Sequence, residues 1–449
     1  MNDAPSPDGF SGYSTALLTD RYELTMLQAA LRSGAANRRS VFEVFARRLP
    51  DGRRYGVVAG TGRLLESLSR FRFDEAELEW LERHKVVDDD TLRWLADYRF
   101  TGSIWGYAEG ECFFPGSPIL VVEGTFAEAV LLETLALSVL NHDSAIASAA
   151  SRMTCAAGGR PLIEMGSRRT HERSAVAAAR AAVIGGFDTT SNLEAGRRFG
   201  LATAGTAAHS FTLLHDDEKA AFAAQVDSMG TSTTLLVDTY DVEAAVRTAI
   251  EVAGTSLGAV RIDSGDLVTL AEEVRAQLDS LGAPKTKIVV TSDLDEYAIA
   301  ALAAAPVDAY GVGTSLVTGS GHPTAGLVYK LVAREGRDGE MVNVAKASKH
   351  KISIGGRKYA LRRRDASGVA EAEVIGIGRA PVDDGDDRAL LVPLVIDGEI
   401  DVAQTGPGAV LAARARHQAS FAELPPVAHR LQRGEPAIPT VYEQEEAVS

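Results

Sequence analysis

The sequence is poor in cysteine, in long apolar runs and in basic charge. It has only two cysteines, Cys112 and Cys155, in 449 residues, which excludes a disulfide framework or a cysteine-rich zinc site. The longest apolar stretch, residues 127–140, is interrupted by Glu128 and Glu133. No segment therefore reaches the roughly 20 apolar residues that a membrane-spanning helix needs. With 46 basic and 61 acidic residues the net charge is −15, which argues against nucleic acid or an anionic membrane as a partner.

The rest of the composition is typical of a globular protein. Hydrophobic residues make up 45% and charged residues 24% of the chain, which excludes disorder of the whole chain. At ~150 residues per domain, the length predicts about three domains, or one large α/β unit with a second one attached. Residues 1–14 are polar and lack the basic and apolar regions of a signal peptide. We therefore expect a flexible leader and a cytoplasmic enzyme.

Residues 15–155 are predicted to form an N-terminal α+β domain. A helix is expected to begin at Asp20, which has capping-box spacing to Glu23, and to end at Gly34. Hydrophobic patterning predicts further elements after this helix. They are a strand at 39–47, short helices within 74–99, a small β element at 101–124 and a long helix at about 126–153.

Residues 156–330 repeat an apolar run followed by a helical stretch, at the pitch of βα units. The apolar runs are continuous rather than alternating, which predicts parallel strands buried on both faces. No G-x-G-x-x-G motif follows an early strand, so we favour an irregular TIM-like α/β barrel over a dinucleotide-binding sheet. The predicted strands are 162–165, 183–187, 202–205, 235–237, 260–262, 288–290 and 307–312.

The C-terminal segment, residues 331–449, is predicted to be rich in β-structure and to pack on the N-terminal domain. The fold class is thus an α/β barrel domain plus a mixed α+β domain built from both ends of the chain. A Pro/Glu-rich tail from about residue 424 is expected to be partly flexible or to lie on the surface. The β-type runs are 328–333, 342–347, 351–354 and 358–362.

Polar residues follow the predicted barrel strands directly. Asp238, Asp263, Asp293 and Thr314 each come after an apolar run, and Arg261 lies within one. Active sites of α/β barrels lie at the carboxyl ends of the strands, and carboxylates there suit a Mg²⁺-bound polyphosphate. The alternative is that these acids cap the next helix; for the three acids together we favour a functional site.

Two further segments are suited to anions. Residues 311–321 are small and rich in hydroxyl groups, so their backbone N–H groups are suited to phosphate, although glycine loops are also plain turns. Arg168 and Arg169 follow the strand at 162–165. Guanidinium groups pair bidentately with carboxylate or phosphate, and the alternative there is a solvated loop.

Residues 205–211, Gly-Thr-Ala-Ala-His-Ser-Phe, are the most informative stretch. His209 follows a run of very small residues, which allows close approach by backbone or substrate and suits a nucleophilic imidazole. For the remaining histidines, including His171 and His215, we expect a structural or capping role.

These motifs together resemble the nicotinate phosphoribosyltransferases, of the type II phosphoribosyltransferase group. The resemblance extends over residues 15–362 and is carried by motifs in the family's order. They are LLTDRYELTM, GSRRTH, GFDTTSN, GTAAHSF, LLVDTYD, VRIDSGDL, TSDLDE, GVGTSLVT and a K-x-S-x-x-K stretch at 346–351.

The resemblance implies a reaction. Nicotinate and phosphoribosyl pyrophosphate would give nicotinate mononucleotide and pyrophosphate in NAD salvage, coupled to hydrolysis of ATP and assisted by Mg²⁺. His209 stands where the family carries a phosphorylated histidine. Tyr22 matches a tyrosine that reaches the nicotinate site from the partner subunit, which implies a homodimer with shared active sites.

The resemblance also implies roles for further residues. Thr206 and Arg261 match positions that contact nicotinate, and Arg168 matches an arginine near the base or the product phosphate. Asp238 and Asp263 match acids around the ribose and the Mg²⁺-pyrophosphate. Gly313 and Thr314 match the phosphate-binding loop. The sequence does not decide which acid binds the metal.

Asp188 departs from the expected pattern. It aligns with a position at which nicotinamide-using relatives carry an acid, and an acid beside the ring favours a neutral amide over a carboxylate. The surrounding Thr-Thr-Ser-Asn resembles the nicotinate enzymes, so we expect nicotinate; Asp188 alternatively faces away as a cap. A nicotinamide or quinolinate phosphoribosyltransferase and a non-catalytic nucleotide-binding barrel are the competing hypotheses for the whole chain.

Overall fold

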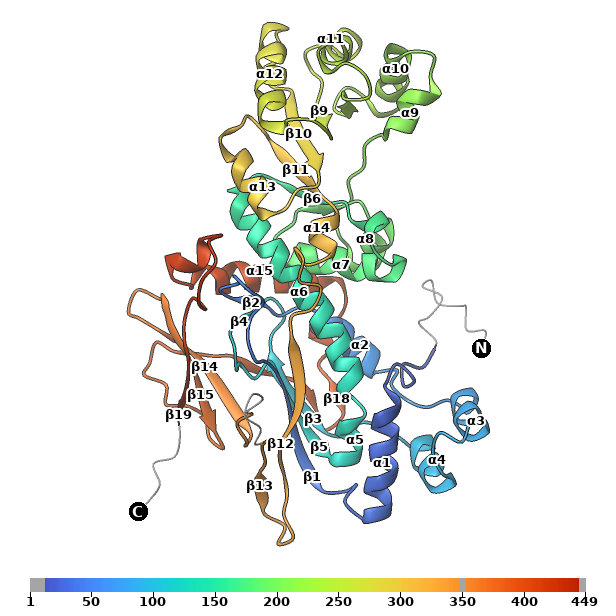
Figure 1. Cartoon of the computed structure of the whole chain (residues 1–449), viewed down its shortest axis with the longest axis vertical. Coiled ribbons are helices and arrows are strands. Elements are labelled where there is room, and N and C mark those ends of the chain that lie inside the picture. Colours follow the sequence, from blue (N-terminus) through green and yellow to red (C-terminus); the bar gives the residue numbers. More distant parts are fainter. Residues whose placement is uncertain (1–12, 347–352, 444–449) are drawn as a thin grey trace. The chain divides into compact units, whose positions relative to one another are not determined.

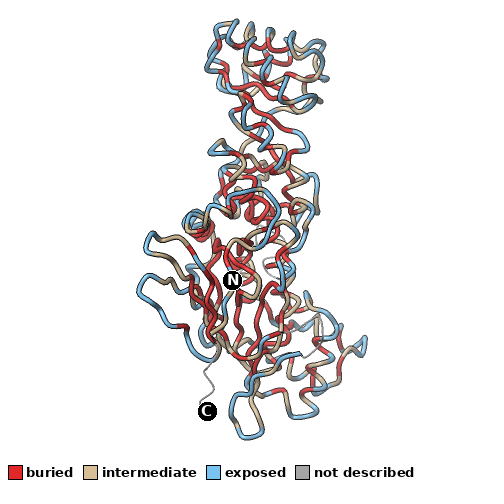
Figure 2. The backbone as a smooth tube through the Cα atoms, turned by 60° about the vertical axis from the view of Figure 1, so that its left-hand side comes forward, coloured by how far each residue is buried: buried red, intermediate tan, exposed pale blue. Residues whose placement is uncertain are grey.

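The computed structural model describes residues 13–346 and 353–443 (Figure 1). The chain divides into two compact units: unit 1 comprises residues 1–145 and 324–449, and unit 2 comprises residues 146–323. Helix α6 (Glu133–Ala157) runs through the division. In both units the strands are mostly buried, and the exposed residues lie mainly in loops and on the outer faces of helices (Figure 2).

Unit 2 is organised around a six-stranded sheet in the order β7-β6-β11-β10-β9-β8. Every neighbouring pair is parallel, and strand β9 is buried along its whole length, as expected for a sheet covered by helices. The strands are β6 (Leu162–Glu164), β7 (Thr189–Thr190), β8 (Thr234–Leu236), β9 (Ala259–Ile262), β10 (Lys287–Ser292) and β11 (Ala309–Val312).

This sheet is a curled parallel half-barrel. Strands β7 and β8 are its two edges and do not pair with each other, so the described strands do not form a closed barrel. The prediction of successive parallel βα units is confirmed for five of the seven predicted strands. The predicted strand at 202–205 is reduced to a single bridge between Thr190 and Thr203.

The predicted strand at 183–187 is wrong. Val183 and Ile184 instead end helix α7 (Glu172–Ile184), and strand β7 follows it. Every residue from Ala177 to Ile184 is buried. A helix that is buried on all sides has no polar face, so its β-branched end resembles a buried strand in sequence.

Helices connect the strands of unit 2, and many of them begin at an aspartate or asparagine. The side chain of this residue accepts a hydrogen bond from a backbone N–H in the first helical turn. The helices after α7 are α8 (Leu193–Phe199), α9 (His209–Leu214), α10 (Glu218–Met229), α11 (Val242–Ala253), α12 (Leu267–Ser280), α13 (Glu296–Ala301) and α14 (Thr314–Val317), with 3₁₀ turns η1 (Ser167–Arg169) and η2 (Leu302–Ala304).

Unit 1 contains an antiparallel seven-stranded sheet in the order β13-β12-β1-β5-β3-β17-β18, a four-stranded sheet β16-β14-β15-β19 and the pair β2-β4. Strand β1 pairs with β5 and also with β12, which is nearly 300 residues away in the chain. The strands are β1 (Arg39–Ala46), β2 (Gly56–Val57), β3 (Ser103–Tyr107), β4 (Cys112–Phe113), β5 (Leu120–Thr125), β12 (Leu327–Glu335), β13 (Met341–Asn343), β14 (Lys358–Arg364), β15 (Ala370–Ile377), β16 (Arg388–Ala389), β17 (Leu391–Ile396), β18 (Glu399–Ile400) and β19 (Thr440–Glu443).

Most helices of unit 1 agree with the predicted positions, but α2 and α15 were not predicted. Helix α15 was missed because its sequence begins with Gly-Pro-Gly, which is typical of a turn. No helix of the described residues is long and apolar enough to cross a membrane. The helices are α1 (Arg21–Ser33), α2 (Thr61–Leu68), α3 (Glu75–Arg83), α4 (Asp89–Ala96), α5 (Phe126–Val130), α6, α15 (Gly406–Ala422) and 3₁₀ turns η3 (Val402–Gln404) and η4 (Pro426–His429).

Helix α1 begins and ends as predicted, but not with the predicted capping box. Asp20 is the residue before the helix and makes no side-chain capping hydrogen bond, and Gly34 ends the helix with a φ of 74°. Glu23 is fully buried, and its Oε1 accepts hydrogen bonds from the backbone N–H and the hydroxyl of Thr134. The carboxylate thus joins α1 to α6 instead of capping its own helix.

The C-terminal tail is part of unit 1 as far as Glu443. Strand β19 pairs with β15 in parallel, and Ile438 is buried. Residues 444–449 and 1–12, which include most of the predicted leader, lie outside the described residues, as do positions 351 and 352 of the predicted strand 351–354.

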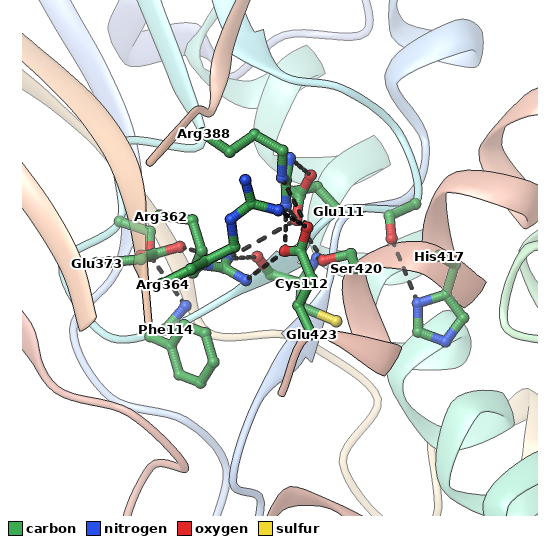
Figure 3. A network of polar contacts seen from close by, with 12 residues as sticks. Glu111, Cys112, Phe114, Arg362, Arg364, Glu373, Arg388, His417, Ser420 and Glu423 are labelled. Carbon is green, nitrogen blue, oxygen red and sulfur yellow. Dashed lines mark hydrogen bonds and ion pairs between the residues drawn. The ribbon is translucent and has the colours of Figure 1, made fainter. Parts of the chain in front are cut away.

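A buried ionic network joins the two chain segments of unit 1 (Figure 3). The Arg362 guanidinium donates to Glu373 at 2.9 Å, and neither side chain is exposed. Arg388 forms bidentate pairs with Glu111, at 2.8 and 2.9 Å, and with Glu423, at 3.0 and 2.8 Å. Because Glu111 belongs to the N-terminal segment, this network ties strands β14–β16 to it.

Candidate functional site

A cleft of about 220 Å³ lies at the carboxyl ends of four parallel strands of unit 2. Strands β6, β9, β10 and β11 end beside it, which is where sites of α/β sheets form. The lining residues are Met165, Arg168, Arg169, Arg261, Asp263, Thr291, Ser292, Asp293, Gly311, Gly313 and Thr314.

The strand-end acids are not the helix caps. Helices α11, α12 and α13 are capped by the side chains of Asp241, Asp266 and Asp295, which follow two or three residues later. Each of these connections therefore contains two acids with different roles. Asp238, Asp263 and Asp293 therefore do not cap these helices, which was the alternative interpretation of these acids.

Asp238 connects the next strand end with a histidine. Its Oδ2 accepts hydrogen bonds from the backbone N–H of Asp263, at 2.9 Å, and from the hydroxyl of Ser264, at 2.7 Å. Its Oδ1 lies 3.8 Å from Nε2 of His209, and only 2% of the Asp238 side chain is exposed. Among the described residues this Oδ1 has no hydrogen-bond partner, so it is available to a charged group.

His209 is the first residue of α9, and 41% of its side chain is exposed. Its Nδ1 lies 3.1 Å from the hydroxyl of Thr239. With Thr239 at one ring nitrogen and Asp238 at the other, the imidazole plane is held in a defined orientation. Thr239 was not identified in the sequence, where it was one residue of the motif LLVDTYD.

Arg261 lies in β9 and is 8% exposed. One of its guanidinium nitrogens donates to the hydroxyl of Thr206 at 2.6 Å, and the other lies 3.7 Å from a carboxylate oxygen of Asp263. Burial lowers the pKa of Arg261, while the nearby Asp263 and Asp238 counteract this effect. Its Nε has no hydrogen-bond partner within the described part of the chain, so a donor remains for an anionic ligand.

The end of β10 has a strained backbone at the cleft. Ser292 has a φ of 152°, a value that a non-glycine residue rarely adopts. The preceding residue, Thr291, donates its hydroxyl to Asp263. On the neighbouring strand β11, a Cβ added to Gly311 would overlap the Thr291 methyl group, so the position favours glycine.

Arg168 and Arg169 lie in the turn η1 at the end of β6 and are exposed. Neither side chain forms a hydrogen bond or ion pair with any residue that the structure describes. Gly313 and Thr314 follow the neighbouring strand β11, at the start of α14. The cleft is thus lined by the unpaired guanidinium groups of the turn and by Gly313 and Thr314, an arrangement suited to phosphate.

Five predicted site residues are not among those that line this cleft. Thr206 and Asp238 contact the lining residues Arg261 and Asp263, and His209 lies next to Asp238.

The other two predicted site residues outside the cleft lining are Tyr22 and Asp188. Tyr22 belongs to unit 1, on α1, and is 44% exposed; burial and the neighbouring Glu133 raise its pKa. Asp188 accepts a hydrogen bond from the backbone N–H of Leu162, at the amino end of β6. The sequence predicted that Asp188 lies beside the substrate ring. Its contact with Leu162 instead fits the alternative interpretation, in which Asp188 caps a strand end.

Carboxylates suited to Mg²⁺ are present beside the cleft. Asp238 contributes a buried oxygen without a hydrogen-bond partner among the described residues, and Asp263, 34% exposed, lines the cleft itself. Oxygen ligands of this kind match the preference of Mg²⁺. Of the K-x-S-x-x-K stretch, only Lys346 lies within the described residues.

The fold and the site define an α/β protein with a cleft suited to anions at the carboxyl edge of a parallel sheet. Two family models match the sequence: the N-terminal domain of nicotinate phosphoribosyltransferase over residues 17–141, and the nicotinate phosphoribosyltransferase family over residues 161–368. The chain belongs to the nicotinate phosphoribosyltransferase family.

Curated relatives agree with this assignment. The chain is 59% identical to nicotinate phosphoribosyltransferase pncB1 of Mycobacterium tuberculosis, with 94% of each chain covered. It is 31% identical to human nicotinate phosphoribosyltransferase, with 82% of this chain and 80% of the human protein covered.

Solved structures show the same fold. The crystal structure of human nicotinic acid phosphoribosyltransferase superposes with a TM-score of 0.80 at 26% identity, covering 95% of this chain and 98% of that one. Nicotinate-nucleotide pyrophosphorylase from Pyrococcus furiosus superposes with a TM-score of 0.74 at 25% identity, covering 94% and 98%.

Proposed function

We propose that this protein transfers a phosphoribosyl group from phosphoribosyl pyrophosphate to nicotinate in NAD salvage, coupled to ATP hydrolysis through a phosphohistidine at His209. Membership of the family supports the transfer reaction. The observation that carries the ATP-coupled mechanism is the contact of Asp238 with both His209 and Asp263, because it links an oriented imidazole to a cleft that suits phosphates.

In the transfer step, the bond between the anomeric carbon of the ribose and a pyrophosphate oxygen breaks, and its electron pair leaves with pyrophosphate. The pyridine nitrogen of nicotinate forms the new bond to that carbon. Arg168 and Arg169 stabilise the negative charge that grows on the leaving group. Arg261, held by Thr206 and Asp263, binds the carboxylate of nicotinate.

The ribosyl group carries positive charge in the transition state, and the carboxylate of Asp263 stabilises that charge at the cleft wall. Asp238 and Asp263 would hold Mg²⁺, which would neutralise charge on the pyrophosphate. Because the nucleophile is already a ring nitrogen, orientation of the two substrates provides most of the acceleration.

ATP reacts with His209. One imidazole nitrogen attacks the γ-phosphorus, ADP leaves with the electron pair of the broken bond, and water later hydrolyses the phosphohistidine to phosphate. Asp238 stabilises positive charge on the ring, and Thr239 keeps its orientation. Tyr22 of a second subunit stacks on the pyridine ring, so the active enzyme is a homodimer with shared sites.

The specificity is for nicotinate. The unpartnered Nε of Arg261 supports an anionic substrate, and Asp188, the acid that favoured nicotinamide, contacts the amino end of β6 instead. Quinolinate remains the alternative substrate for an anion-binding site of this kind.

The test is pyrophosphate release measured with nicotinate, nicotinamide and quinolinate, each with and without ATP. We expect release with nicotinate, accelerated by ATP. Faster turnover of nicotinamide or quinolinate would contradict the specificity, and no release with any of the three would contradict the function.

His209→Ala should abolish ATP hydrolysis and acid-labile phosphorylation while leaving weak, ATP-independent transfer. His215→Ala is the matched control. His215 follows the same short helix, and its Nδ1 lies 2.9 Å from the backbone oxygen of Phe211. Full ATP coupling in His209→Ala would remove this histidine from the mechanism.

A further inference from the structure

A buried carboxylate lies behind the turn that bears the two cleft arginines. Glu164 ends β6 and is fully buried. One of its oxygens accepts the backbone N–H of Gly166, the residue directly before the turn, and the second oxygen accepts the hydroxyl of Thr190. Burial raises the pKa of Glu164, and these two hydrogen bonds counteract the effect.

Thr190 and Asn192 connect Glu164 to a second position of the turn. The Thr190 hydroxyl, which donates to Glu164, accepts the backbone N–H of Asn192 at 2.9 Å. Asn192 caps α8 through its Oδ1, and its side-chain amide donates to the Ser167 hydroxyl at 2.9 Å. We call Glu164, Thr190 and Asn192 the Thr190 network. It holds the turn at both Gly166 and Ser167.

The turn itself has little stability of its own. It is a three-residue 3₁₀ segment without a side-chain cap, and its arginines are exposed. It also packs tightly, because a Cβ added to Gly166 would overlap a methyl group of Val317. The position of Arg168 therefore depends on the hydrogen bonds at Gly166 and Ser167, and Thr190 is the residue that joins them.

We propose that Thr190 is a positioning residue, which through Glu164 and Asn192 holds Arg168 in place to bind the phosphates of the phosphoribosyl donor. This inference rests on the proposed function, because it takes the donor as the ligand of the cleft. It gives a role to the Thr-Thr-Ser-Asn segment, which has none in the proposed transfer and phosphorylation steps. Thr190 acts through the turn and touches no substrate.

The neighbouring threonine provides a matched control. Thr189 precedes Thr190 in β7, and its buried hydroxyl has no hydrogen-bond partner within the described residues. Thr190→Val and Thr189→Val are the same nearly isosteric change, the first removing a connected hydroxyl and the second an unconnected one. Thr190→Ser keeps the hydroxyl and should restore most of the affinity.

The measurement is binding of phosphoribosyl pyrophosphate with Mg²⁺ by isothermal titration calorimetry, on the full chain. We expect Thr190→Val to weaken binding about fivefold, the loss of roughly one hydrogen bond's contribution, while Thr189→Val binds as the wild type does. In an Arg168→Ala background, Thr190→Val should cause no further loss, because the two residues act through one contact.

The outcomes separate the two proposals. If the wild type forms nicotinate mononucleotide and Thr190→Val binds the donor with wild-type affinity, the function stands and this inference is overturned. Additive losses in Thr190→Val and Arg168→Ala also overturn it. If the wild type does not bind the donor, both fail. If Thr190→Val does not fold, Ser167→Ala takes its place. Ser167→Ala removes the hydroxyl that accepts the hydrogen bond from Asn192, and its donor affinity is compared with that of the wild type and in the Arg168→Ala background.

Discussion

Replacing Arg362 with methionine should strongly destabilise unit 1. Methionine fills much of the volume of the arginine side chain but removes its charge. Glu373, whose side chain is fully buried, would keep only the hydroxyl of Ser117 as a partner. Glu111 would be affected less, because Arg388 still pairs with it at 2.8 and 2.9 Å. The cost therefore falls mainly on Glu373.

Removing one partner of a buried ion pair typically costs about 3–5 kcal/mol, because the remaining charge is uncompensated. We expect Arg362→Met to lie in this range, since both side chains are fully buried. The orphaned Glu373 can reduce the cost only by taking up a proton. Its pKa in the variant then lies above the unfolded value, so the variant should lose stability as the pH rises, and the loss should be larger at pH 8 than at pH 5.

The assay is urea denaturation followed by tryptophan fluorescence. The three tryptophans, Trp80, Trp94 and Trp105, all belong to unit 1, so the signal reports this unit. Arg364→Met is the control on the same strand. Its side chain is 28% exposed and lies 3.5 Å from Glu423, and the change should cost about 1 kcal/mol.

The double variant Arg362→Met/Glu373→Gln distinguishes a buried charge from lost packing. Glutamine keeps an oxygen for Ser117 but carries no charge, so the double variant should be more stable than Arg362→Met alone. If it is equally or less stable, the cost comes from lost packing, and the electrostatic explanation is refuted.

Two further predictions concern α1. Burial raises the pKa of Glu23 to about 7, above its unfolded value, so the folded state binds the proton more tightly and stability falls as the pH rises from about 4.5 to 7. Glu23→Gln should flatten this slope in urea midpoints measured across that range, and an unchanged slope would contradict the assignment. Tyr22→Ala should raise the KM for nicotinate, and mixing it with His209→Ala chains should restore activity in mixed dimers. Failure of that complementation would mean that each site is built within one chain.

The sequence alone was sufficient for five strands of unit 2 and for the family. Continuous apolar runs at regular spacing identified β6, β8, β9, β10 and β11 because parallel strands are buried on both faces. Motifs such as GTAAHSF and GSRRTH are short and retain their order along the chain, so they identify the family without coordinates.

Contacts between distant residues required the tertiary structure. Glu23 has the spacing of a capping residue, yet it binds Thr134, and sequence spacing contains no information about a partner 111 residues away. The sequence likewise did not predict that Arg362 and Glu373 form a buried ion pair. Residues 183–187 resembled a strand because the buried end of α7 has no polar face and so loses the periodic signature of a helix.

In the candidate site, the sequence showed which residue types are present but not which role each of them has. The sequence determined that acids, arginines and His209 follow the strands at one edge of a sheet. Only the fold decided that Asp241, Asp266 and Asp295 cap the helices and leave the strand-end acids to the cleft. It also decided that Asp188 contacts the opposite end of β6. The physical reason is that chain pattern determines which side chains reach a sheet edge, whereas hydrogen bonding between neighbouring strands and loops determines which of them remain free to bind a ligand.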